Sequence, residues 1–233
     1  MIFTRNLKKL SIELKAEFDN NRPFSHIYID NLFDENILQA AVEEIPKTTG
    51  INKGYQDKHQ VKNLIEGEAL LTTSPENIRK VFSALNSPEF ITFLQELTGI
   101  KDLFADNTFR GGGIHKISRG GKLGIHIDFS RPNWNRNVFR RANVLLYLNK
   151  DWKDEYEGHL ELWDDSVKNE GKCIMKIAPI FNRLVIFGTK EASWHGHPTP
   201  LNTPETMQRL SFASYYYSNE PSDDLIEHST IFN

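Results

Sequence analysis

The segment that decides the fold is Gly113-Ile-His-Lys-Ile-Ser-Arg-Gly-Gly-Lys-Leu-Gly-Ile-His-Ile-Asp128. Apolar and polar residues alternate on both sides of Gly120-Gly121, which is typical of two short strands separated by a tight turn. Residues two apart on a strand point to the same side of a sheet. The segment therefore predicts two strands, and it places the side chains of His126 and Asp128 next to each other on one face.

Similar short runs recur along the chain after residue 100. The predicted strands cover residues 108–109, 113–118, 124–127, 142–148, 159–163, 173–177, 184–187 and 210–217. Several short strands separated by turn signals favour an antiparallel sandwich or barrel. No linker rich in Pro, Gly or Ser interrupts residues 100–220, so the sequence predicts a single domain over residues 1–233.

The first hundred residues carry helical patterns instead. Amphipathic or capped runs predict helices over residues 5–19, 35–45, 75–85 and 88–97, and an alternating run predicts one strand over residues 24–30. The polar, glycine-containing stretch 48–70 predicts a mobile loop. We expect the helices to pack on one outer face of the sheet.

Composition excludes several functional classes. Lys and Arg number 28 against 31 Asp and Glu, a formal charge of −3, which gives no overall electrostatic signature for nucleic acid or an anionic membrane. No apolar run approaches the roughly 20 residues of a membrane-spanning helix. The single cysteine, Cys173, cannot form an internal disulfide, and the start of the sequence lacks a secretory pattern. We expect a cytoplasmic protein, either a monomer or a homodimer.

Three histidines and one aspartate in the strand-rich half suggest a metal site. His126 and Asp128 share a strand face, and the apolar run 184–187 is followed by His195 and His197. One carboxylate and two imidazoles form the facial triad that suits non-haem Fe(II) and leaves coordination positions open. A closed zinc site prefers further protein ligands, especially thiolates, and Cys173 has no partner thiol. Either His195 or His197 can supply the second imidazole.

Arg209 predicts a binding site for an anion. Arg209 and Ser211 alternate onto one face of a predicted strand, and a guanidinium inside an apolar barrel requires an anionic partner. A dicarboxylate cosubstrate supplies such a partner in bidentate fashion. Tyr147 lies on another predicted strand and can donate a second hydrogen bond to it.

The segment 129–141 directly follows the metal motif and is rich in cationic side chains. It contains Trp134 together with four arginines: Arg131, Arg136, Arg140 and Arg141. Guanidinium groups beside an aromatic ring suit an acidic or carboxylate-bearing substrate, which makes Arg131, Trp134 and Arg141 candidate substrate contacts. The alternative is a solvated lid whose arginines pair with surface carboxylates.

The order of these motifs resembles a known family. Tyr147-Leu-Asn-Lys-Asp-Trp, then Gly158-His-Leu-Glu-Leu-Trp, then Asn182-Arg-Leu-Val-Ile-Phe with His195 eight residues beyond, and finally Arg209, are similar to the 2-oxoglutarate- and Fe(II)-dependent dioxygenases of the prolyl 4-hydroxylase type. The resemblance covers approximately residues 100–218. Its specificity lies in the order and spacing of the parts.

The resemblance implies a mainly β fold, the double-stranded β-helix or cupin-like jelly roll, with helices packed on one sheet. We expect residues 1–100 to form a helical support region with an opening strand, residues 101–220 to form the catalytic core, and residues 221–233 to form a C-terminal tail. The implied cofactors are Fe(II), 2-oxoglutarate and O2. The implied activity is hydroxylation of an unactivated C–H bond, with 2-oxoglutarate converted to succinate and CO2.

The resemblance also implies roles for individual residues. Iron is ligated by His126, Asp128 and His195, and the distal carboxylate of 2-oxoglutarate is bound by Arg209 with help from Tyr147. His195 is preferred to His197 because its distance from the 184–187 strand matches the family pattern.

Two further residues bear on the reaction that the resemblance implies. His115 stands near the place where many relatives carry a tyrosine, so we expect it to contact the cosubstrate. Relatives that halogenate lack the carboxylate, so Asp128 favours hydroxylation.

Two other functions are compatible with a jelly roll. A cupin-type hydrolase or isomerase would use the same triad with zinc or another divalent ion, but it leaves Arg209 unexplained. A non-catalytic ligand-binding jelly roll does not explain why the three candidate metal ligands and Arg209 occur together with this spacing. Nothing in the sequence identifies the substrate, which can be a prolyl or other peptidyl residue or a small molecule.

Overall fold

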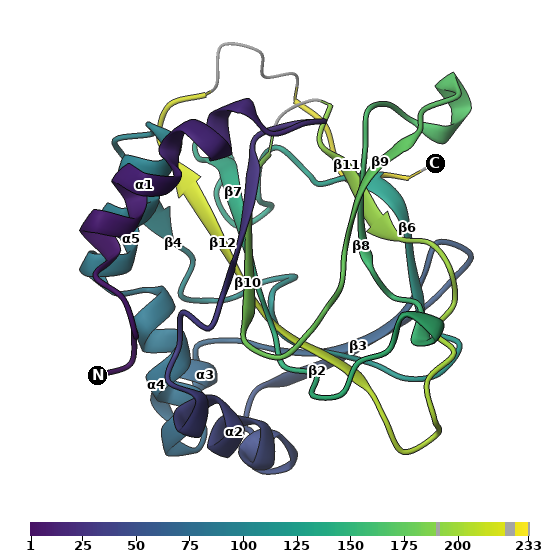
Figure 1. Cartoon of the computed structure of the whole chain (residues 1–233), viewed down its shortest axis with the longest axis horizontal. Helices are drawn as coiled ribbons and strands as arrows, with labels where there is room; N and C mark the ends of the chain where they lie inside the picture. The colour runs from purple at the N-terminus through teal and green to yellow at the C-terminus, as the bar shows by residue number, and fades with distance from the viewer. Residues whose placement is uncertain (190–191, 222–226, 233) are drawn as a thin grey trace.

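The computed structural model describes residues 1–189, 192–221 and 227–232. Over these residues one 13-stranded antiparallel sheet curls on itself, and the helices gather on one side of it (Figure 1). This is the jelly roll with flanking helices that the sequence predicts. No helix in the described ranges is long and apolar enough to cross a membrane.

The helices form where the sequence predicts them, with one addition. They are α1 (Leu7–Asn20), α2 (Glu35–Glu44), α3 (Ala69–Thr72), α4 (Glu76–Leu85) and α5 (Pro88–Thr98). Asn6, Asp34 and Ser87 each accept a backbone N–H at the start of a helix, as N-cap residues do. The short α3 was not predicted.

Eight strands lie at or close to their predicted positions. These are β1 (His26–Asp30), β5 (Gly113–Ile117), β6 (Lys122–Ile127), β7 (Phe139–Tyr147), β8 (Leu160–Trp163), β9 (Cys173–Ile177), β10 (Arg183–Gly188) and β12 (Arg209–Ser218). The predicted strand at 108–109 is wrong. Phe109 has a positive φ of 49° and belongs to a turn, and the adjacent strand is β4 (Phe104–Ala105).

The predicted mobile loop at 48–70 is also wrong. It contains the hairpin β2 (Ile51–Gln56) and β3 (Gln60–Glu66). β3 pairs with β6 through its first residues and with β5 through its later ones, so it joins the two halves of the roll. One side of this hairpin faces a polar cavity, which removes the apolar alternation that identifies a strand.

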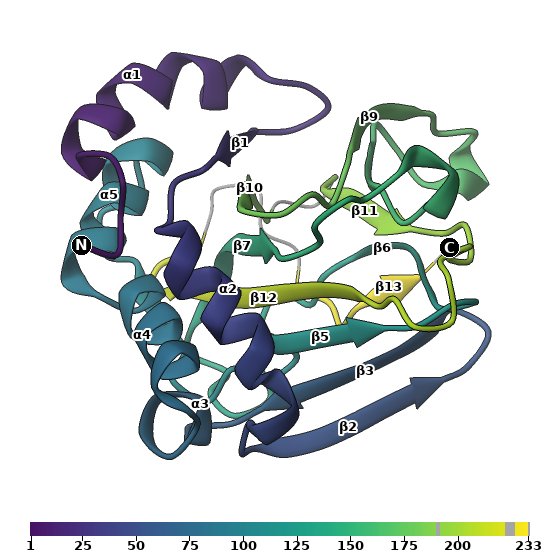
Figure 2. The same cartoon turned by 60° about the horizontal axis from the view of Figure 1, so that its bottom comes forward.

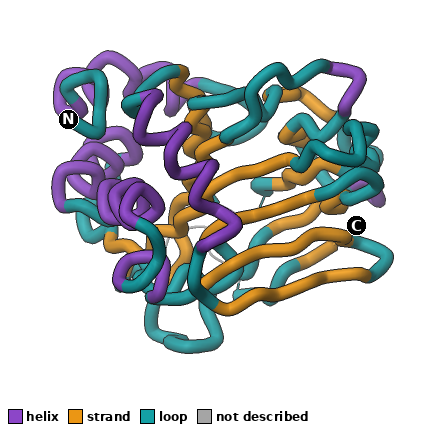
Figure 3. The backbone as a smooth tube through the Cα atoms, turned by 90° about the horizontal axis from the view of Figure 1, so that it is seen from below, coloured by secondary structure: helices purple, strands orange, loops and turns teal. Residues whose placement is uncertain are grey.

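The strand order is β1-β10-β7-β12-β5-β3-β6-β11-β8-β9, with β2 and β13 (Ile231–Phe232) attached to β3 and β6. β11 spans Trp194–His197. The outer face of β10, β7 and β12 packs against the helices through the largest apolar cluster, which includes Phe82, Phe90 and Phe212. Figures 2 and 3 show the helices on one side of the curled sheet. The concave face is left for the site.

Candidate active site

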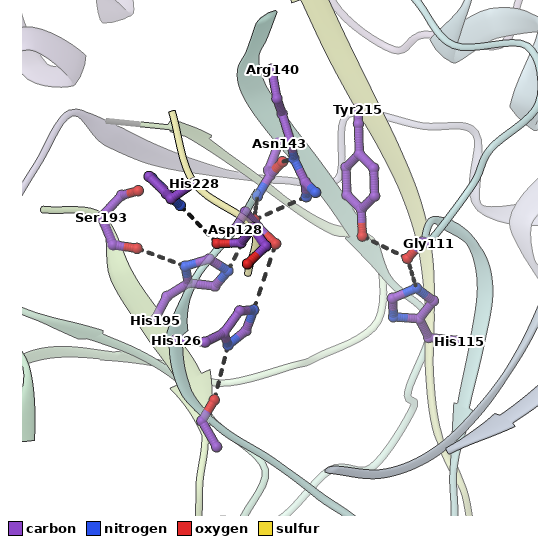
Figure 4. Close-up of polar contacts among 12 residues, drawn as sticks. Gly111, His115, His126, Asp128, Arg140, Asn143, Ser193, His195, Tyr215 and His228 are labelled. Carbon is purple, nitrogen blue, oxygen red and sulfur yellow. Dashed lines mark hydrogen bonds and ion pairs between the residues drawn. The ribbon is translucent and has the colours of Figure 1, made fainter. Parts of the chain in front are cut away.

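His126, Asp128 and His195 meet on the concave face of the sheet. His126 lies on β6 directly opposite His195 of β11, and Asp128 follows the end of β6. The Asp128 carboxylate lies 3.6 Å from Nε2 of His126 and 3.4 Å from Nε2 of His195 (Figure 4). One ligand atom from each residue lies within 4.8 Å of the other two.

The hydrogen bonds of the two imidazoles show that this cluster fits a cation. Nδ1 of His126 lies 2.9 Å from the carbonyl oxygen of Gly124, and Nδ1 of His195 lies 2.8 Å from that of Ser193. A carbonyl only accepts, so each Nδ1 carries a proton and each ring presents its Nε2 atom toward Asp128. Two Nε2 atoms and a carboxylate then converge, and two imidazoles with one carboxylate are a donor set that suits a divalent metal.

Close approach of the two strands brings the imidazoles together. A Cβ added to Gly196 would lie 2.6 Å from the carbonyl oxygen of Gly124, so a side chain cannot be accommodated at that position. The pairing of β11 with β6 shifts register between His195 and His197. Glycine at this position therefore lets β11 lie against β6 and sets the separation of the two imidazoles.

Arg140 and Asn143 hold the carboxylate of Asp128. Its Oδ2 atom lies 2.9 Å from the Arg140 guanidinium and accepts a 2.7 Å hydrogen bond from Asn143. Nε of Arg140 also donates to Oδ1 of Asn143 at 2.8 Å, which closes the network. Burial alone would raise the pKa of Asp128, but Arg140 and the two imidazoles hold that pKa well below its usual range. Asp128 is therefore an anion when the site is empty.

A β-bulge turns Arg140 into the site. Ala142 pairs with Tyr216 and Arg140 pairs with Tyr217, which leaves Arg141 as an extra residue in β7. The Arg140 guanidinium packs over the ring of Tyr215, 3.5 Å from its centroid. The sequence predicts Arg140 in the substrate-facing segment 129–141. Strict alternation along β7 would put it on the opposite face from Asn143, and the bulge brings the two to the same side.

Replacing Arg140 with Gln should weaken metal binding. The change removes the charge that positions Asp128 and leaves all three metal ligands in place, and losses of this kind are about 10- to 100-fold in affinity. Calorimetric titration of the metal-free protein with Mn(II) measures the effect. Arg136→Gln is the matched control, because Arg136 pairs with Glu227 at the surface. Equal affinities in the two variants would exclude the positioning role.

A cavity of about 680 Å³ opens beside the three ligands. Arg209 reaches into it from β12 and is only 4% exposed. Its Nε donates to the carbonyl oxygen of Gly158 at 2.7 Å, and its Nη2 lies 3.2 Å from the Tyr147 hydroxyl. No carboxylate of the described chain pairs with this guanidinium. A buried, unpaired guanidinium requires an anion, and the predicted cosubstrate supplies one.

Ser211 and His115 lie opposite each other in the β12–β5 pair, and both line the cavity. The His115 Nε2 atom donates to the carbonyl oxygen of Gly111 at 3.0 Å, which also accepts the Tyr215 hydroxyl at 2.7 Å (Figure 4). Burial, reinforced by the nearby charge of Lys62, lowers the pKa of His115 to about 3. The cosubstrate contact assigned to His115 stays a prediction.

The neutral state of His115 predicts an acid-sensitive stability. Because the folded pKa lies below the unfolded value of about 6.5, the unfolded chain binds more protons between these two values. The free energy of unfolding should therefore be highest above pH 6.5 and fall as the pH drops toward 3, by at most about 1.4 kcal/mol per pH unit for this residue. Urea unfolding of metal-free His115→Gln should show a shallower fall than wild type. His159→Gln is the control variant. An unfolding free energy that falls as steeply with pH in His115→Gln as in His159→Gln would contradict this prediction.

His197 is buried in the cavity wall and does not belong to the ligand cluster. Neither of its ring nitrogens has a hydrogen-bond partner among the described residues. Burial and the charge of Arg209 hold its pKa well below the usual value. His195, and not His197, therefore joins His126 and Asp128, in agreement with the sequence-based preference.

The candidate substrate contacts separate into two groups. Arg131 and Trp134 line the cavity, although Arg131 also pairs with Glu227. Arg141 does not line it, because the bulge directs its guanidinium to the Ser218 hydroxyl and the carbonyl oxygen of Glu220. The alternative, in which arginines of this segment pair with surface carboxylates, is thus correct for Arg131 and Arg136.

Several site residues have no signal in the sequence. Asn143 was not singled out, because a buried amide inside an apolar strand has no motif of its own. Phe232 of β13 pairs with His126, and its ring lies 4.7 Å from that of His59 and 5.2 Å from that of His126. Lys62 comes from the stretch that was assigned to a loop. None of these contacts has a local sequence signal.

A family comparison decides the classification. The model of the 2OG-Fe(II) oxygenase superfamily matches residues 112–217, the segment that contains all three candidate ligands and Arg209. These residues belong to the 2OG-Fe(II) oxygenase superfamily. The protein is accordingly a dioxygenase that depends on Fe(II), 2-oxoglutarate and O2, and the predicted enzyme class and cofactors are confirmed.

Solved structures share the fold of this oxygenase. A prolyl hydroxylase from Trichoplax adhaerens, in complex with a hypoxia inducible factor peptide fragment, is 18% identical, with a TM-score of 0.64 over 91% of this chain and 90% of that one. A Pseudomonas putida prolyl-4-hydroxylase is 13% identical, with a TM-score of 0.59 over 92% and 99%. A non-haem α-ketoglutarate-dependent carbocyclase from nogalamycin biosynthesis is 13% identical, with a TM-score of 0.62 over 98% and 96%.

Proposed function

We propose that this oxygenase hydroxylates an unactivated C–H bond of its substrate, with His126, Asp128 and His195 as the iron ligands. The observation that carries the proposal is the convergence of two Nε2 atoms and a carboxylate beside the Arg209 guanidinium, which has no carboxylate partner among the described residues. A cation site next to an anion site is what a metal and a dicarboxylate cosubstrate require together.

Iron and 2-oxoglutarate, when bound, supply the oxidising chemistry: substrate C–H, O2 and 2-oxoglutarate give substrate C–OH, succinate and CO2. His126, Asp128 and His195 would hold the metal through two imidazoles and one carboxylate, a donor set that leaves coordination positions open. Arg140 and Asn143 fix the orientation of the Asp128 carboxylate. Retention of this carboxylate favours hydroxylation over halogenation.

Arg209 and Tyr147 bind the distal carboxylate of 2-oxoglutarate. The guanidinium is held in place by the carbonyl oxygen of Gly158, and its Nη2 atom reaches the Tyr147 hydroxyl. Burial raises the pKa of Tyr147, although Arg209 opposes this rise, so the phenol stays protonated and can donate. Apolar side chains such as Leu160 and Phe187 line the cavity and limit access of water.

An anaerobic titration tests this function directly. We expect Fe(II)-loaded protein to develop a weak visible charge-transfer band when 2-oxoglutarate is added, because the 2-oxo acid chelates the metal. Admission of O2 should then release succinate. Absence of the band at saturating iron and 2-oxoglutarate would overturn the proposal, and it would favour a cupin-type metalloprotein.

A further inference from the structure

The ammonium group of Lys62 is an unused positive charge in the wall of the active-site cavity. Lys62 lies half-buried on β3 and lines the cavity together with His115 and Arg209. Within the described residues its ammonium makes no ion pair and no hydrogen bond. The ammonium lies over the ring of Tyr55, 5.4 Å from the centroid.

Most other cations of the cavity wall already have anionic partners. Lys53 pairs with Glu66, and Arg140 pairs with Asp128. Arg131 and Arg136 both pair with Glu227. Of the remaining lining cations, Arg110 is exposed at the rim, which leaves the buried Arg209 and the half-buried Lys62.

The cofactors do not neutralise Lys62. The two positive charges of Fe(II) match the two negative charges of 2-oxoglutarate, and Asp128 is matched by Arg140. Arg209 is then paired with the distal carboxylate of 2-oxoglutarate, the cavity keeps an excess of positive charge, and Lys62 is the buried or half-buried lining cation left without an anionic partner among the described residues. Such a cavity attracts anions and binds them more strongly than an exposed surface does.

The protonation state of Lys62 agrees with this role. Burial lowers its pKa to about 8, a shift that Asp128 opposes and that Arg140 and Arg209 reinforce. The ammonium is still the major form at neutral pH, and a nearby anion would stabilise it further.

We propose that Lys62 binds an anionic group, a carboxylate or a phosphate, of the primary substrate. This inference rests on the proposed function, because it requires 2-oxoglutarate to occupy the site at Arg209. The sequence-based interpretation placed the anion-binding residues in a different segment of the chain. The anion-binding residue comes from the β2–β3 hairpin, whereas most arginines of the 129–141 segment are engaged with other groups.

Paramagnetic line broadening tests the proposal without turnover. The protein is loaded with Mn(II), saturated with 2-oxoglutarate and mixed with two matched pairs of probes: benzoate with benzamide, and phenyl phosphate with phenol. Broadening of the probe proton signals reports binding close to the metal. We expect an anionic probe to be broadened at least about tenfold more than its neutral partner, and the two pairs distinguish carboxylate from phosphate.

Variants assign the effect to Lys62. Lys62→Gln should reduce the broadening of the anionic probe about tenfold, and Lys62→Arg should restore most of it. Lys116→Gln is the control, because Lys116 lies on neighbouring β5 and does not line the cavity. The affinity for 2-oxoglutarate should stay within about twofold of wild type in Lys62→Gln. Thermal melting confirms that each variant is folded.

The proposal would be overturned by equal broadening of charged and neutral probes, by unchanged broadening in Lys62→Gln, or by a large loss of 2-oxoglutarate affinity in that variant. A decrease of the broadening as 2-oxoglutarate is raised would also overturn it, because the probe would then occupy the cosubstrate site. Failure of Mn(II) or 2-oxoglutarate to bind at all would instead contradict the proposed function.

Discussion

Replacement of Asp128 with Asn should reduce turnover more than about 1,000-fold, which corresponds to about 4 kcal/mol. The substitution preserves shape and part of the hydrogen bonding to Arg140 and Asn143, but it removes the only anionic ligand of the cluster. His126→Ala and His195→Ala should have effects of the same order. Succinate release and calorimetric titration with Mn(II) measure activity and metal affinity separately.

His197→Ala provides the matched control for the metal ligands. His197 is as buried as His195 and lies two residues away, yet it stands outside the ligand cluster. Its removal should leave Mn(II) affinity within about threefold of wild type, because no metal ligand is lost. Normal metal binding in His195→Ala together with its loss in His197→Ala would reverse the ligand assignment.

Arg209→Ala should raise the 2-oxoglutarate concentration needed for half-maximal turnover about 100-fold. The guanidinium is the buried cation that reaches the Tyr147 hydroxyl, and charge-assisted bidentate hydrogen bonds to a carboxylate are among the strongest in proteins. Metal affinity should remain close to wild type, because none of the ligands changes. Tyr147→Phe removes only one neutral donor, so its effect should be about tenfold or less.

Steady-state kinetics with varied 2-oxoglutarate and varied iron separate these contributions. An effect of Arg209→Ala confined to the iron requirement would exclude its cosubstrate role, and so would an unchanged 2-oxoglutarate requirement. Arg183→Ala is a suitable control, because Arg183 forms its ion pair with Asp30 on the outer part of the sheet.

Local patterns were sufficient for much of the fold. Helix caps such as Asp34 and Ser87, and the alternation of β6, depend on residues a few positions apart, so a single sequence carries the signal. The β2–β3 hairpin had no such signal, because its inward face is polar. β11 is four residues long and contains Gly196 between two histidines, which hides its strand character.

The candidate site was predictable where its residues lie close together in the sequence, or where their order and spacing match those of the family. His126 and Asp128 are two residues apart, and the spacing after β10 located His195. Arg140 was misassigned because a bulge at Arg141 reverses the alternation of β7. The position of Lys62 depends on the pairing of β3 with both β5 and β6, a tertiary contact that composition and periodicity do not encode.

The opposed histidines of β6 and β11 also have a consequence for the lifetime of the protein. These strands share few aligned residue pairs, and their outer faces pack through a small cluster of Ile125, Ile127 and tryptophan side chains. An ion held between His126 and His195 joins the two strands as a non-covalent cross-link. A ligand that binds only the folded state stabilises that state in proportion to its occupancy. With His126 and His195 as ligands, we therefore expect iron supply to affect how much of the chain resists unfolding and proteolysis, in addition to how fast it turns over substrate.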